Sequence, residues 1–495
     1  MSSLAYALPP IIQGGMGIGV SNWVLARAVS LRGQLGVVSG TAVDSLFIRR
    51  LQDGDIGGHV RRAMEHFPMP EVSAAALKAY FLPDGRPEDV PYKPLAMWRQ
   101  VVSQAREQIT MLASFVEVYL AREGHDGVVG VNLLTKVQMP NLATLYGAML
   151  AGVDCVIMGA GIPREIPGVL DAFAEGRAAS IRLDVEGGAR DDSELLRFDP
   201  ARHWQGEAPA LARPLFLPIV AAHSLATMLT RKANGRIDGF VVEGPTAGGH
   251  NAPPRGLTVM NERGEPVYGP RDEVDPAAMR DLGLPFWLAG GTGSPEKLET
   301  ALNVGAAGIQ VGTLFAYTRE SGLDPALKKQ VLEQVVEGTI DVKTDPRASP
   351  TGFPFKVVNL AGTNALQDEY ARRERVCDLG YLRTAYRRPD GRLDYRCAAE
   401  PVDTFVKKGG AVEDTVGRKC LCNGLMANIG HPQVREEGLE RPILTSGDGL
   451  KCMAPFVGPD GYSADDVITY LIGDLTLPPR AVGREQPARA LALHE

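Results

Sequence analysis

One histidine lies in a segment whose composition suits chemistry on a flat ligand. The segment VVEGPTAGGHNAPPRG begins at Val241 and places His250 directly after Gly248 and Gly249. An imidazole exchanges protons near neutral pH, and glycines let a ring approach the backbone closely. A lone histidine is more often structural, but the place of His250 at the end of an apolar run favours a functional role. We therefore predict that His250 is catalytic and that Gly248 and Gly249 bind a cofactor.

Two further glycine-rich segments have the features of a phosphate site. They read LAGGTGSPEKL from Leu288 and GIQVGTLF from Gly308. Glycine leaves backbone N–H groups open to a phosphate, and the Ser294–Pro295 pair starts a helix whose positive end favours an anion. One such loop would indicate only a tight turn, whereas two successive loops favour phosphate binding. The predicted phosphate-binding residues are Gly290, Gly291, Gly312 and Thr313.

A third glycine-rich segment, IIQGGMGIGVSN from Ile11, lacks the G-x-G-x-x-G spacing and the later acidic residue of a dinucleotide-binding Rossmann fold. It would instead place backbone and a thioether against a bound ring, although Met16 could equally fill the core. Asn132 and Glu243 are polar residues in apolar runs, and such residues usually point into a site. The predicted cofactor-binding residues of these segments are Gln13, Gly14, Gly15, Met16, Asn132 and Glu243.

These residues all lie near the ends of short apolar runs that alternate with amphipathic helical patterns. Nearly continuous hydrophobicity is typical of parallel strands buried on both faces. Eight strand and helix units in succession predict a TIM (β/α)8 barrel, whose active site lies at the carboxyl ends of the strands and whose last two loops often bind phosphate. The predicted strands are 10–15, 35–40, 127–134, 155–160, 214–223, 238–244, 285–291 and 308–315.

The spacing of the strands predicts the domain organisation. Residues 1–340 form the barrel, with a helical insertion at about 59–126 between the second and third strands, including helices over 70–80 and 94–123. The alternation stops after residue 340, so 341–480 form a smaller module that contains most of the cysteines. The Pro- and Ala-rich segment 481–495 is predicted to be a flexible tail.

Composition limits the classes of partner. The 495 residues carry 52 Lys and Arg against 59 Asp and Glu, a net charge of −7 without a long basic block, which disfavours nucleic acid. There is no uninterrupted apolar stretch of about 18 residues and no secretory signal pattern, so we expect a cytoplasmic protein without a membrane span.

Two clusters receive no assigned role. Cys377, Cys397, Cys420 and Cys422 could form a zinc or iron–sulfur site, but they lack paired C-x2-C spacing, so buried reduced thiols are the default and no metal is predicted. The segment from Ala179 is predicted to be an extra hairpin. Its acidic residues (Asp184, Glu186, Asp191, Asp192 and Glu194) fit an exposed loop better than a cation site.

The order of PIIQGGMGIGVS, VNLL, EGPTAGGHN, PFWLAGGTGS and GAAGIQVGTLF resembles the FMN-dependent nitronate monooxygenase family, formerly called 2-nitropropane dioxygenases. Relatives of that family include FMN-dependent enoyl-acyl-carrier-protein reductases. The resemblance covers most of residues 8–320 and implies a TIM barrel with noncovalent FMN across its mouth. It implies that Glu243 stands where the family often has Gln, and that His250 is the active-site histidine. It also implies contacts to the flavin from Gly14, Gly15, Met16 and Asn132, and to its phosphate from Gly290, Gly291, Gly312 and Thr313.

The chain departs from the family pattern in the insertion, the acidic hairpin, the C-terminal module and the Asn251, Pro253 and Pro254 that follow the histidine. These departures leave several functions open. The leading hypothesis is oxidation of a small alkyl nitronate by O2. The alternative is an NAD(P)H-dependent enoyl-thioester reductase, which could take its substrate from an acyl carrier protein.

Two further readings use the same phosphate loop. GAAGIQVGTLFAYTRES also resembles the phosphate loop of inosine monophosphate dehydrogenases, which need a nucleophilic cysteine. No cysteine occurs between Cys155 and Cys377, so that reading requires a C-terminal thiol over the mouth of the barrel. A noncatalytic phospholigand-binding barrel would leave His250 without a purpose.

Overall fold

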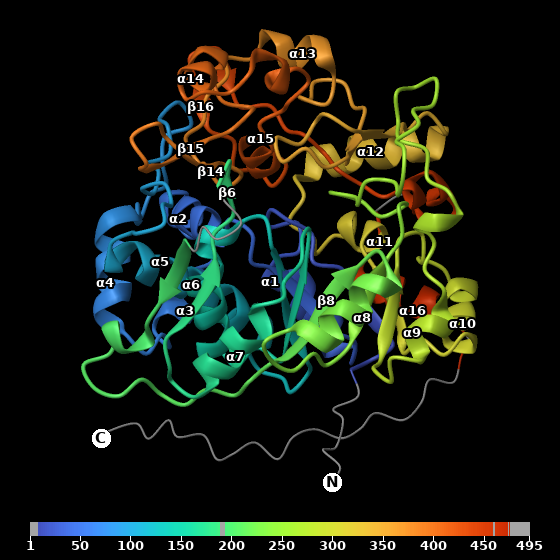
Figure 1. The fold of residues 1–495 in the computed structure, drawn as a ribbon, viewed down its shortest axis with the longest axis horizontal. Helices are drawn as coiled ribbons and strands as arrows, with labels where there is room; N and C mark the ends of the chain where they lie inside the picture. The colour runs from blue at the N-terminus through green and yellow to red at the C-terminus, as the bar shows by residue number, and fades with distance from the viewer. Residues whose placement is uncertain (1–7, 189–193, 459–460, 474, 476–495) are drawn as a thin grey trace.

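Eight parallel strands close into a barrel in the computed structural model, which describes residues 8–188, 194–458, 461–473 and 475 (Figure 1). The strand order is β2-β3-β4-β8-β9-β10-β11-β1, and a parallel bridge between Ile12 and Leu35 joins the two end strands. The predicted (β/α)8 barrel is therefore confirmed. Its strands are β1 (Ile11–Gln13), β2 (Gly36–Ser39), β3 (Val129–Leu134), β4 (Cys155–Gly159), β8 (Leu215–Val220), β9 (Phe240–Glu243), β10 (Phe286–Ala289) and β11 (Gly308–Val311).

The apolar runs form strands because both faces of each strand are buried. Along β9, Val241 packs with Trp287 inside the barrel, whereas Phe240 and Val242 join the larger core between strands and helices. The indole N–H of Trp287 donates to the carbonyl of Pro9 at 3.0 Å. The amino-terminal end of the barrel is thus filled by side chains, and space for a ligand remains at the other end.

A ring of helices surrounds the strands. Polar side chains cap two of them: Asn22 accepts a hydrogen bond from the Leu25 N–H at 2.9 Å, and Ser294 accepts one from the Lys297 N–H at 3.3 Å. The helices that follow the strands are α1 (Trp23–Leu31), α5 (Gln104–Arg122), α6 (Gln138–Leu150), α7 (Ile166–Ala174), α8 (His223–Lys232), α9 (Pro276–Arg280), α10 (Pro295–Asn303) and α16 (Ala464–Ile472). The last of these packs against both α1 and α10, in the place of the eighth ring helix.

The insertion between β2 and β3 is helical, as the sequence predicts. It contains α2 (Val43–Gln52), α3 (His59–Met64) and α4 (Pro70–Tyr80), which pack on one another and on α5 (Figure 1). The helix predicted to start at 94 begins only at Gln104, after the cap residue Ser103. The prolines Pro91 and Pro94 keep the preceding segment out of helical conformation.

A buried ion pair fastens this insertion to the rest of the molecule. Asp44 of α2 lies 2.8 Å from the guanidinium of Arg106 on α5, with both side chains at most 5% exposed. Asp44 also accepts hydrogen bonds from the indole of Trp98 at 3.2 Å and from the hydroxyl of Tyr381 at 2.5 Å. Because Tyr381 belongs to the C-terminal segment, one carboxylate connects three parts of the chain.

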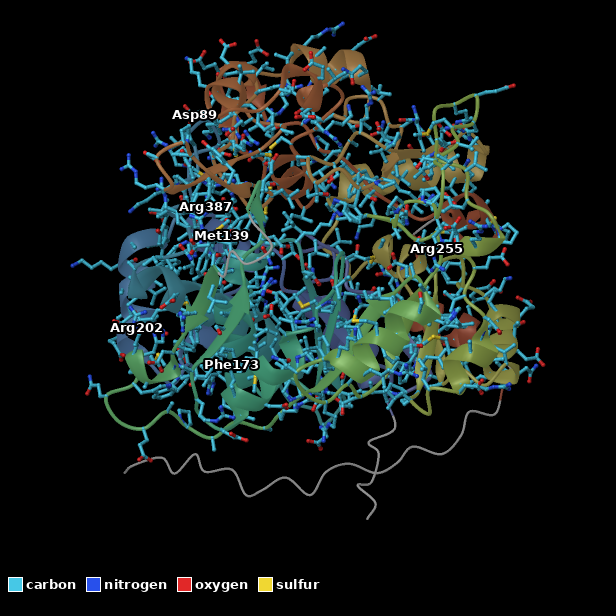
Figure 2. All side chains as sticks on the ribbon, viewed as in Figure 1. Asp89, Met139, Phe173, Arg202, Arg255 and Arg387 are labelled. Atoms are coloured by element: carbon cyan, nitrogen blue, oxygen red, sulfur yellow. The ribbon has the colours of Figure 1, made fainter. Side chains whose placement is uncertain are left out.

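The predicted hairpin after α7 is present as the antiparallel pair β5 (Ala179–Arg182) and β7 (Leu195–Phe198). Phe173 of α7, labelled in Figure 2, is fully buried and contacts Tyr146 and Phe198 through rings at 5.3 and 5.4 Å. Of the acidic residues in the hairpin, Glu194 pairs with Arg387 at 2.8 Å. Asp191 and Asp192 lie outside the described residues.

Most of the segment after residue 340 lies over one end of the barrel, drawn yellow-orange to red in Figure 1, whereas its last helix, α16, lies beside α10. The segment contains three antiparallel pairs, β12 with β13, β14 with β15 and β16 with β17, and short β6 extends the second pair. The predicted tail 481–495 lies outside the described residues. The remaining bounds are β6 (Val185–Glu186), α11 (Thr313–Ala316), α12 (Pro325–Glu337), β12 (Val342–Asp345), β13 (Phe355–Val358), α13 (Gln367–Arg372), β14 (Thr384–Arg387), β15 (Leu393–Arg396), α14 (Val402–Lys407), α15 (Leu421–Ala427), β16 (Val434–Arg435) and β17 (Gly438–Leu439).

Within the described parts of the chain, none of the helices combines the length and the apolar character that crossing a bilayer requires.

Candidate active site

A cavity of about 630 Å³ opens at the carboxyl ends of the barrel strands. That volume is typical of small-molecule sites. The cavity brings together all the predicted site residues except Gln13. Its lining includes Gly14, Gly15, Met16, Asn132, Glu243, Gly248, Gly249, His250, Gly290, Gly291, Gly312 and Thr313.

Gln13 lies behind the cavity wall and holds the loop that follows β1. Its amide Nε2 donates to Ser21 Oγ at 2.8 Å, and its Oε1 accepts from the Val37 N–H at 2.9 Å. Ser21 Oγ in turn accepts from the Met16 N–H at 2.8 Å and donates to the Gly14 carbonyl at 2.9 Å. Gln13 thus positions the ring-facing loop through Ser21 instead of lining the cavity.

The loop after β1 packs closely on the neighbouring strand ends beside the cavity because two of its residues lack a side chain. A Cβ on Gly15 would lie 2.1 Å from Cβ of Asn132, and one on Gly14 would lie 3.2 Å from Cα of Gly312. Both distances are below ordinary contact, so neither position tolerates a larger residue without movement. Asn132 is 6% exposed and donates through Nδ2 to the Ile157 carbonyl at 3.3 Å.

The other end of the cavity has the geometry of an anion site. Gly290 and Gly291 adopt φ values of +90° and +66°, a backbone region that favours glycine. The chain then enters α10, whose amino-terminal residues Ser294 and Lys297 line the cavity. The helix dipole and the ammonium of Lys297 favour negative charge here.

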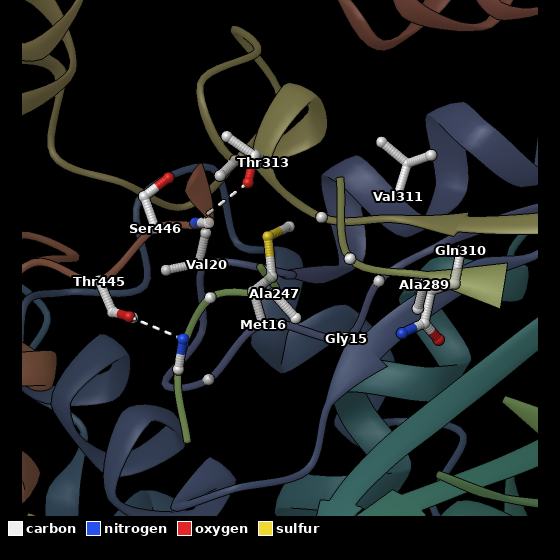
Figure 3. Close-up of a pocket in the computed structure, with 18 of the residues that line it drawn as sticks. Gly15, Met16, Val20, Ala247, Ala289, Gln310, Val311, Thr313, Thr445 and Ser446 are labelled. Carbon is white, nitrogen blue, oxygen red and sulfur yellow. Dashed lines mark hydrogen bonds between the residues drawn. The ribbon is translucent and has the colours of Figure 1, made fainter. Parts of the chain in front are cut away.

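Gln310 of β11 also lines the cavity, and the sequence interpretation missed it. Its Oε1 is buried and has no hydrogen-bond partner within the described structure. Figure 3 shows its side chain beside Ala289, near the loop that holds Gly15. A buried acceptor without a partner is costly, and a ligand donor in the cavity would satisfy it. The signal was available, because Gln310 is a polar residue in an apolar run, as Asn132 and Glu243 are.

Glu243 ends β9 next to Ala289 of β10 and faces the same cavity. Burial raises the pKa of Glu243 to about 8. Its carboxyl group is therefore mostly protonated at neutral pH and presents both a hydrogen-bond donor and an acceptor. In this form it resembles the amide of a glutamine.

His250 lines the cavity as a neutral imidazole. Burial, with a smaller contribution from the charge of Lys136, lowers the pKa of His250 to about 3. Nε2 lies 2.7 Å from Ser349 Oγ, and the ring packs edge to face on Phe355 with centroids 4.9 Å apart. The ring orientation is thus fixed by two residues of the C-terminal segment.

The C-terminal segment supplies a wall of the cavity that the sequence did not predict. In Figure 3, Thr445 and Ser446 face the barrel loops, and dashed lines join Thr445 to the Gly249 N–H at 2.8 Å and Thr313 to the Gly447 N–H at 3.2 Å. The run TSGDG from Thr445 is a glycine- and hydroxyl-rich signal that could have identified this loop. Most of the remaining wall is apolar and includes Phe355, Leu382, Leu421, Leu425, Leu444, Met453 and Phe456.

The clustered cysteines lie elsewhere in that segment. All six cysteines are free thiols, and Cys377, Cys397, Cys420 and Cys422 line one small internal cavity of about 10 Å³. A hydrogen bond from Cys397 lowers the pKa of Cys377, whereas burial raises the pKa of Cys420. In the described parts of the chain, no group of three or more His, Cys, Asp or Glu side chains has an arrangement suited to a metal ion.

Two C-terminal thiols, Cys422 and Cys452, do reach the large cavity, which is the position that a cysteine-dependent barrel enzyme would require. Burial raises the pKa of Cys422 well above its usual range. Since the thiolate is the nucleophile, this shift makes Cys422 a poor one. Cys452 is exposed, in the short helical turn at 448–452.

The fold and the cavity together define a class of protein. A closed (β/α)8 barrel has a cavity at the carboxyl ends of its strands, lined by the glycine-rich loops after its first, seventh and eighth strands, and this is the architecture of barrel enzymes. Residues 209–349 match the family model described as nitronate monooxygenase. This match confirms the resemblance predicted from the motifs.

Curated relatives match over short segments. A probable nitronate monooxygenase from Staphylococcus haemolyticus is 35% identical over 106 residues, which is 21% of this chain and 28% of that protein. The (3aS,4S,5R,7aS)-5-hydroxy-7a-methyl-1-oxo-octahydro-1H-indene-4-carboxyl-CoA dehydrogenase of Rhodococcus jostii is 25% identical over 150 residues, which is 30% of this chain and 36% of that protein. The matched segments therefore span about a third or less of these relatives.

Solved structures resemble the chain over most of its length. FabK from Thermotoga maritima is 16% identical and covers 95% of this chain and 93% of its own, with a TM-score of 0.46. Nitroalkane oxidase from Streptomyces ansochromogenes is 15% identical and covers 95% of this chain and 96% of its own, with a TM-score of 0.43.

Proposed function

We propose that this protein is an FMN-dependent oxidoreductase that oxidises small alkyl nitronates with O2. The proposal depends on one observation above all: a ring-sized space, an anion site and a neutral histidine share a single cavity. The family match over residues 209–349 and the matched nitronate monooxygenase segments support an oxidoreductase of this class.

The residues of the cavity fit FMN. The phosphate would lie at Gly290, Gly291, Gly312 and Thr313, against the start of α10 and near Lys297. The isoalloxazine would lie along Gly14 to Met16 and Asn132, which line the same cavity. Gln310 Oε1 offers the unpartnered acceptor that a ring N–H could satisfy. FMN supplies two-electron chemistry between the substrate and an acceptor.

The side chains around that space would bind the substrate and handle its protons. Neutral His250 can donate a hydrogen bond to an anionic nitronate or exchange a proton with it. Protonated Glu243 can donate a second hydrogen bond, as the Gln often found at this position in the resembled family would. The apolar wall of the C-terminal segment excludes water from the same space and strengthens both interactions.

A second candidate is NAD(P)H-dependent reduction of an enoyl thioester in the same barrel. The observation that favours it is the extended apolar wall of Phe355, Leu382, Leu421, Leu425 and Leu444, which suits an acyl chain better than a small nitronate. Such a substrate could arrive on an acyl carrier protein. One pocket can support either reaction, because the cofactor carries the electrons and the pocket selects the substrate.

The test begins with the visible spectrum of the purified protein and mass analysis of the cofactor that denaturation releases. Released FMN supports the site assignment, whereas released FAD contradicts it. No flavin after reconstitution with FMN also contradicts it and favours a noncatalytic phospholigand site. Steady-state assays then compare propyl-2-nitronate plus O2 with NADPH plus a short enoyl thioester under anaerobic conditions. Saturable, thioester-dependent NADPH consumption with negligible nitronate turnover would favour the second candidate over the first.

A further inference from the structure

Three side chains continue the hydrogen bond of His250 away from its ring. Ser349 Oγ, which lies 2.7 Å from His250 Nε2, also lies 2.8 Å from Thr351 Oγ1. Lys136 Nζ lies 3.4 Å from the same Thr351 oxygen. The chain of contacts joins the loop after β9, the segment between β12 and β13 and the loop after β3, so the tertiary fold alone brings these residues together.

The last member of this row is a lysine in an unusual environment. Its ammonium lies over the face of the Phe353 ring, and within the described structure no carboxylate is at ion-pair distance from it. Partial burial lowers the pKa of Lys136 to about 7. Lys136 therefore exists as a mixture of ammonium and amine at neutral pH and can both give and take a proton.

The direction of the hydrogen bonds follows from the chemistry of the ammonium. An ammonium can only donate, so Lys136 donates to Thr351 Oγ1. Either hydroxyl of the Ser349–Thr351 pair can donate; in the arrangement that passes a proton towards His250, the Thr351 hydroxyl donates to Ser349, whose oxygen also accepts from the Thr351 backbone N–H at 3.2 Å. The Ser349 proton is left to point at His250 Nε2. The neutral imidazole consequently carries its own proton on Nδ1, the ring nitrogen without a hydrogen bond to the described residues.

We infer that Ser349, Thr351 and Lys136 form a proton relay that serves His250 at Nε2 and leaves Nδ1 for the substrate. This inference rests on the proposed function, because it assigns positioning residues to the histidine of that site. Lys136 and the two hydroxyl residues act through His250 and do not themselves touch the reacting atoms.

The relay moves one proton without building charge on the histidine. When His250 gives its Nδ1 proton to the substrate, Nε2 takes the proton of Ser349, Ser349 takes that of Thr351, and Thr351 takes one from the Lys136 ammonium. The substrate gains one proton, Lys136 becomes an amine, and the imidazole is neutral before and after. The reverse sequence removes a proton from the substrate. Because burial makes an imidazolium costly at this position, a relay is the cheaper route.

The other charged groups near the relay do not replace Lys136. Arg418 donates to the backbone carbonyl of Ser349 at 2.7 Å and so fixes the main chain rather than the hydroxyl. Lys356 of β13 is paired with Asp448 at 2.8 Å. Glu243 borders the same cavity, but it is mostly neutral at pH 7.

The first test reads the state of His250 directly in the full-length protein without substrate. ¹⁵N-labelled histidine spectra, with the His250 signals assigned through His250→Gln, report its tautomer and pKa. The relay predicts an Nδ1–H tautomer in the wild type. It predicts loss of that preference in Lys136→Met and Thr351→Val, a His250 pKa higher by about 1 in Lys136→Met, and wild-type behaviour in Lys136→Arg.

Matched controls are Lys329→Met on α12, whose side chain is 78% exposed, and exposed Thr339→Val. Neither should alter the His250 signals. An Nε2–H tautomer in the wild type, or unchanged signals in both relay variants, would overturn the inference.

The second test is the pH profile of turnover with whichever substrate the protein accepts. Lys136→Met and Thr351→Val should lower kcat by about tenfold or more, with little change in KM, and should remove the limb of the profile near neutral pH. Turnover and profiles equal to wild type would overturn the relay. If the spectra behave as predicted but neither candidate substrate is turned over, the relay stands and the proposed function fails.

Discussion

Thr445 Oγ1 accepts a hydrogen bond from the backbone N–H of Gly249 at 2.8 Å, so a residue of the C-terminal segment holds the loop that carries His250. The same loop is paired with β13, because Lys356 N–H donates to the Gly249 carbonyl and Asn251 N–H donates to the Pro354 carbonyl, both at 2.9 Å. The catalytic candidate is therefore positioned from both sides of the cavity. Barrel and C-terminal segment form one site.

Replacement of the histidine tests its role in turnover. We expect His250→Ala to retain the fold and the flavin but to lower kcat by about 100-fold or more, the usual effect of losing a general acid or base. Steady-state kinetics with the accepted substrate provide the measurement. Exposed His223→Ala serves as the control and should keep wild-type turnover. Unchanged kcat and KM in His250→Ala would show that the histidine is structural.

A glycine pair separates phosphate binding from backbone strain. Gly291 and Gly264 have similar φ values, +66° and +71°, but only Gly291 lines the cavity. Valine at either position costs about 1–3 kcal/mol of backbone strain. Only Gly291→Val should also weaken FMN retention, because its side chain would block approach to the backbone. Equilibrium dialysis against FMN compares the two, and equal affinities would refute the phosphate assignment at this loop.

Glu243→Gln should change how stability depends on pH. The native protein keeps the Glu243 proton up to about pH 8, whereas the unfolded chain releases it near the ordinary pKa of 4.5. The contribution of protonated Glu243 to the free energy of unfolding is therefore complete below pH 4.5 and is lost as pH rises towards 8. In urea unfolding, the free energy of unfolding of Glu243→Gln should rise relative to that of the wild type from about pH 5 to about pH 8. Exposed Glu299→Gln should run parallel to the wild type, and parallel curves for Glu243→Gln would contradict the pKa shift.

The buried carboxylate of Asp44 should be essential for stability. Asp44→Ala removes the partner of Arg106 and of the Tyr381 hydroxyl and leaves an uncompensated buried charge. We expect a loss of about 3–5 kcal/mol in the free energy of unfolding. Denaturant titration should show no comparable loss for Asp390→Ala, whose carboxylate pairs with Arg392 in an exposed turn. If the free energy of unfolding falls no more in Asp44→Ala than in the control, Asp44 does not anchor the insertion to the rest of the molecule.

The barrel and half of the cavity could be predicted because their signals are local. Each strand is an apolar run followed by glycine or a helix cap, and a parallel barrel brings all carboxyl ends to one face. That rule placed Asn132 of β3 in one cavity with Glu243 and His250, although β4 and β8 lie between β3 and β9. Gln13 was assigned to the ring site on the same rule, but its side chain turns towards Ser21 and supports the loop instead.

The rest of the site depends on contacts between distant segments that no periodic pattern encodes. Ser349, Thr351 and Thr445 lie in loops. Their hydroxyls reach the site only because β13 pairs with the loop that carries His250. The apolar wall is equally hidden, because Leu382 and Leu421 resemble ordinary core residues in the sequence. Their role follows from the folded position of the C-terminal segment.

The position of α16 between α1 and α10 has a consequence for the order of synthesis. The amphipathic segment that completes the ring of helices leaves the ribosome after every other described helix. Until it emerges, α1 and α10 expose apolar surface that α16 later covers, and a barrel of this size has many nonlocal contacts to form. The apolar face of α1 therefore stays uncovered while the C-terminal segment is synthesised. A chain that ends before Ala464 lacks the helix that completes the ring around the barrel.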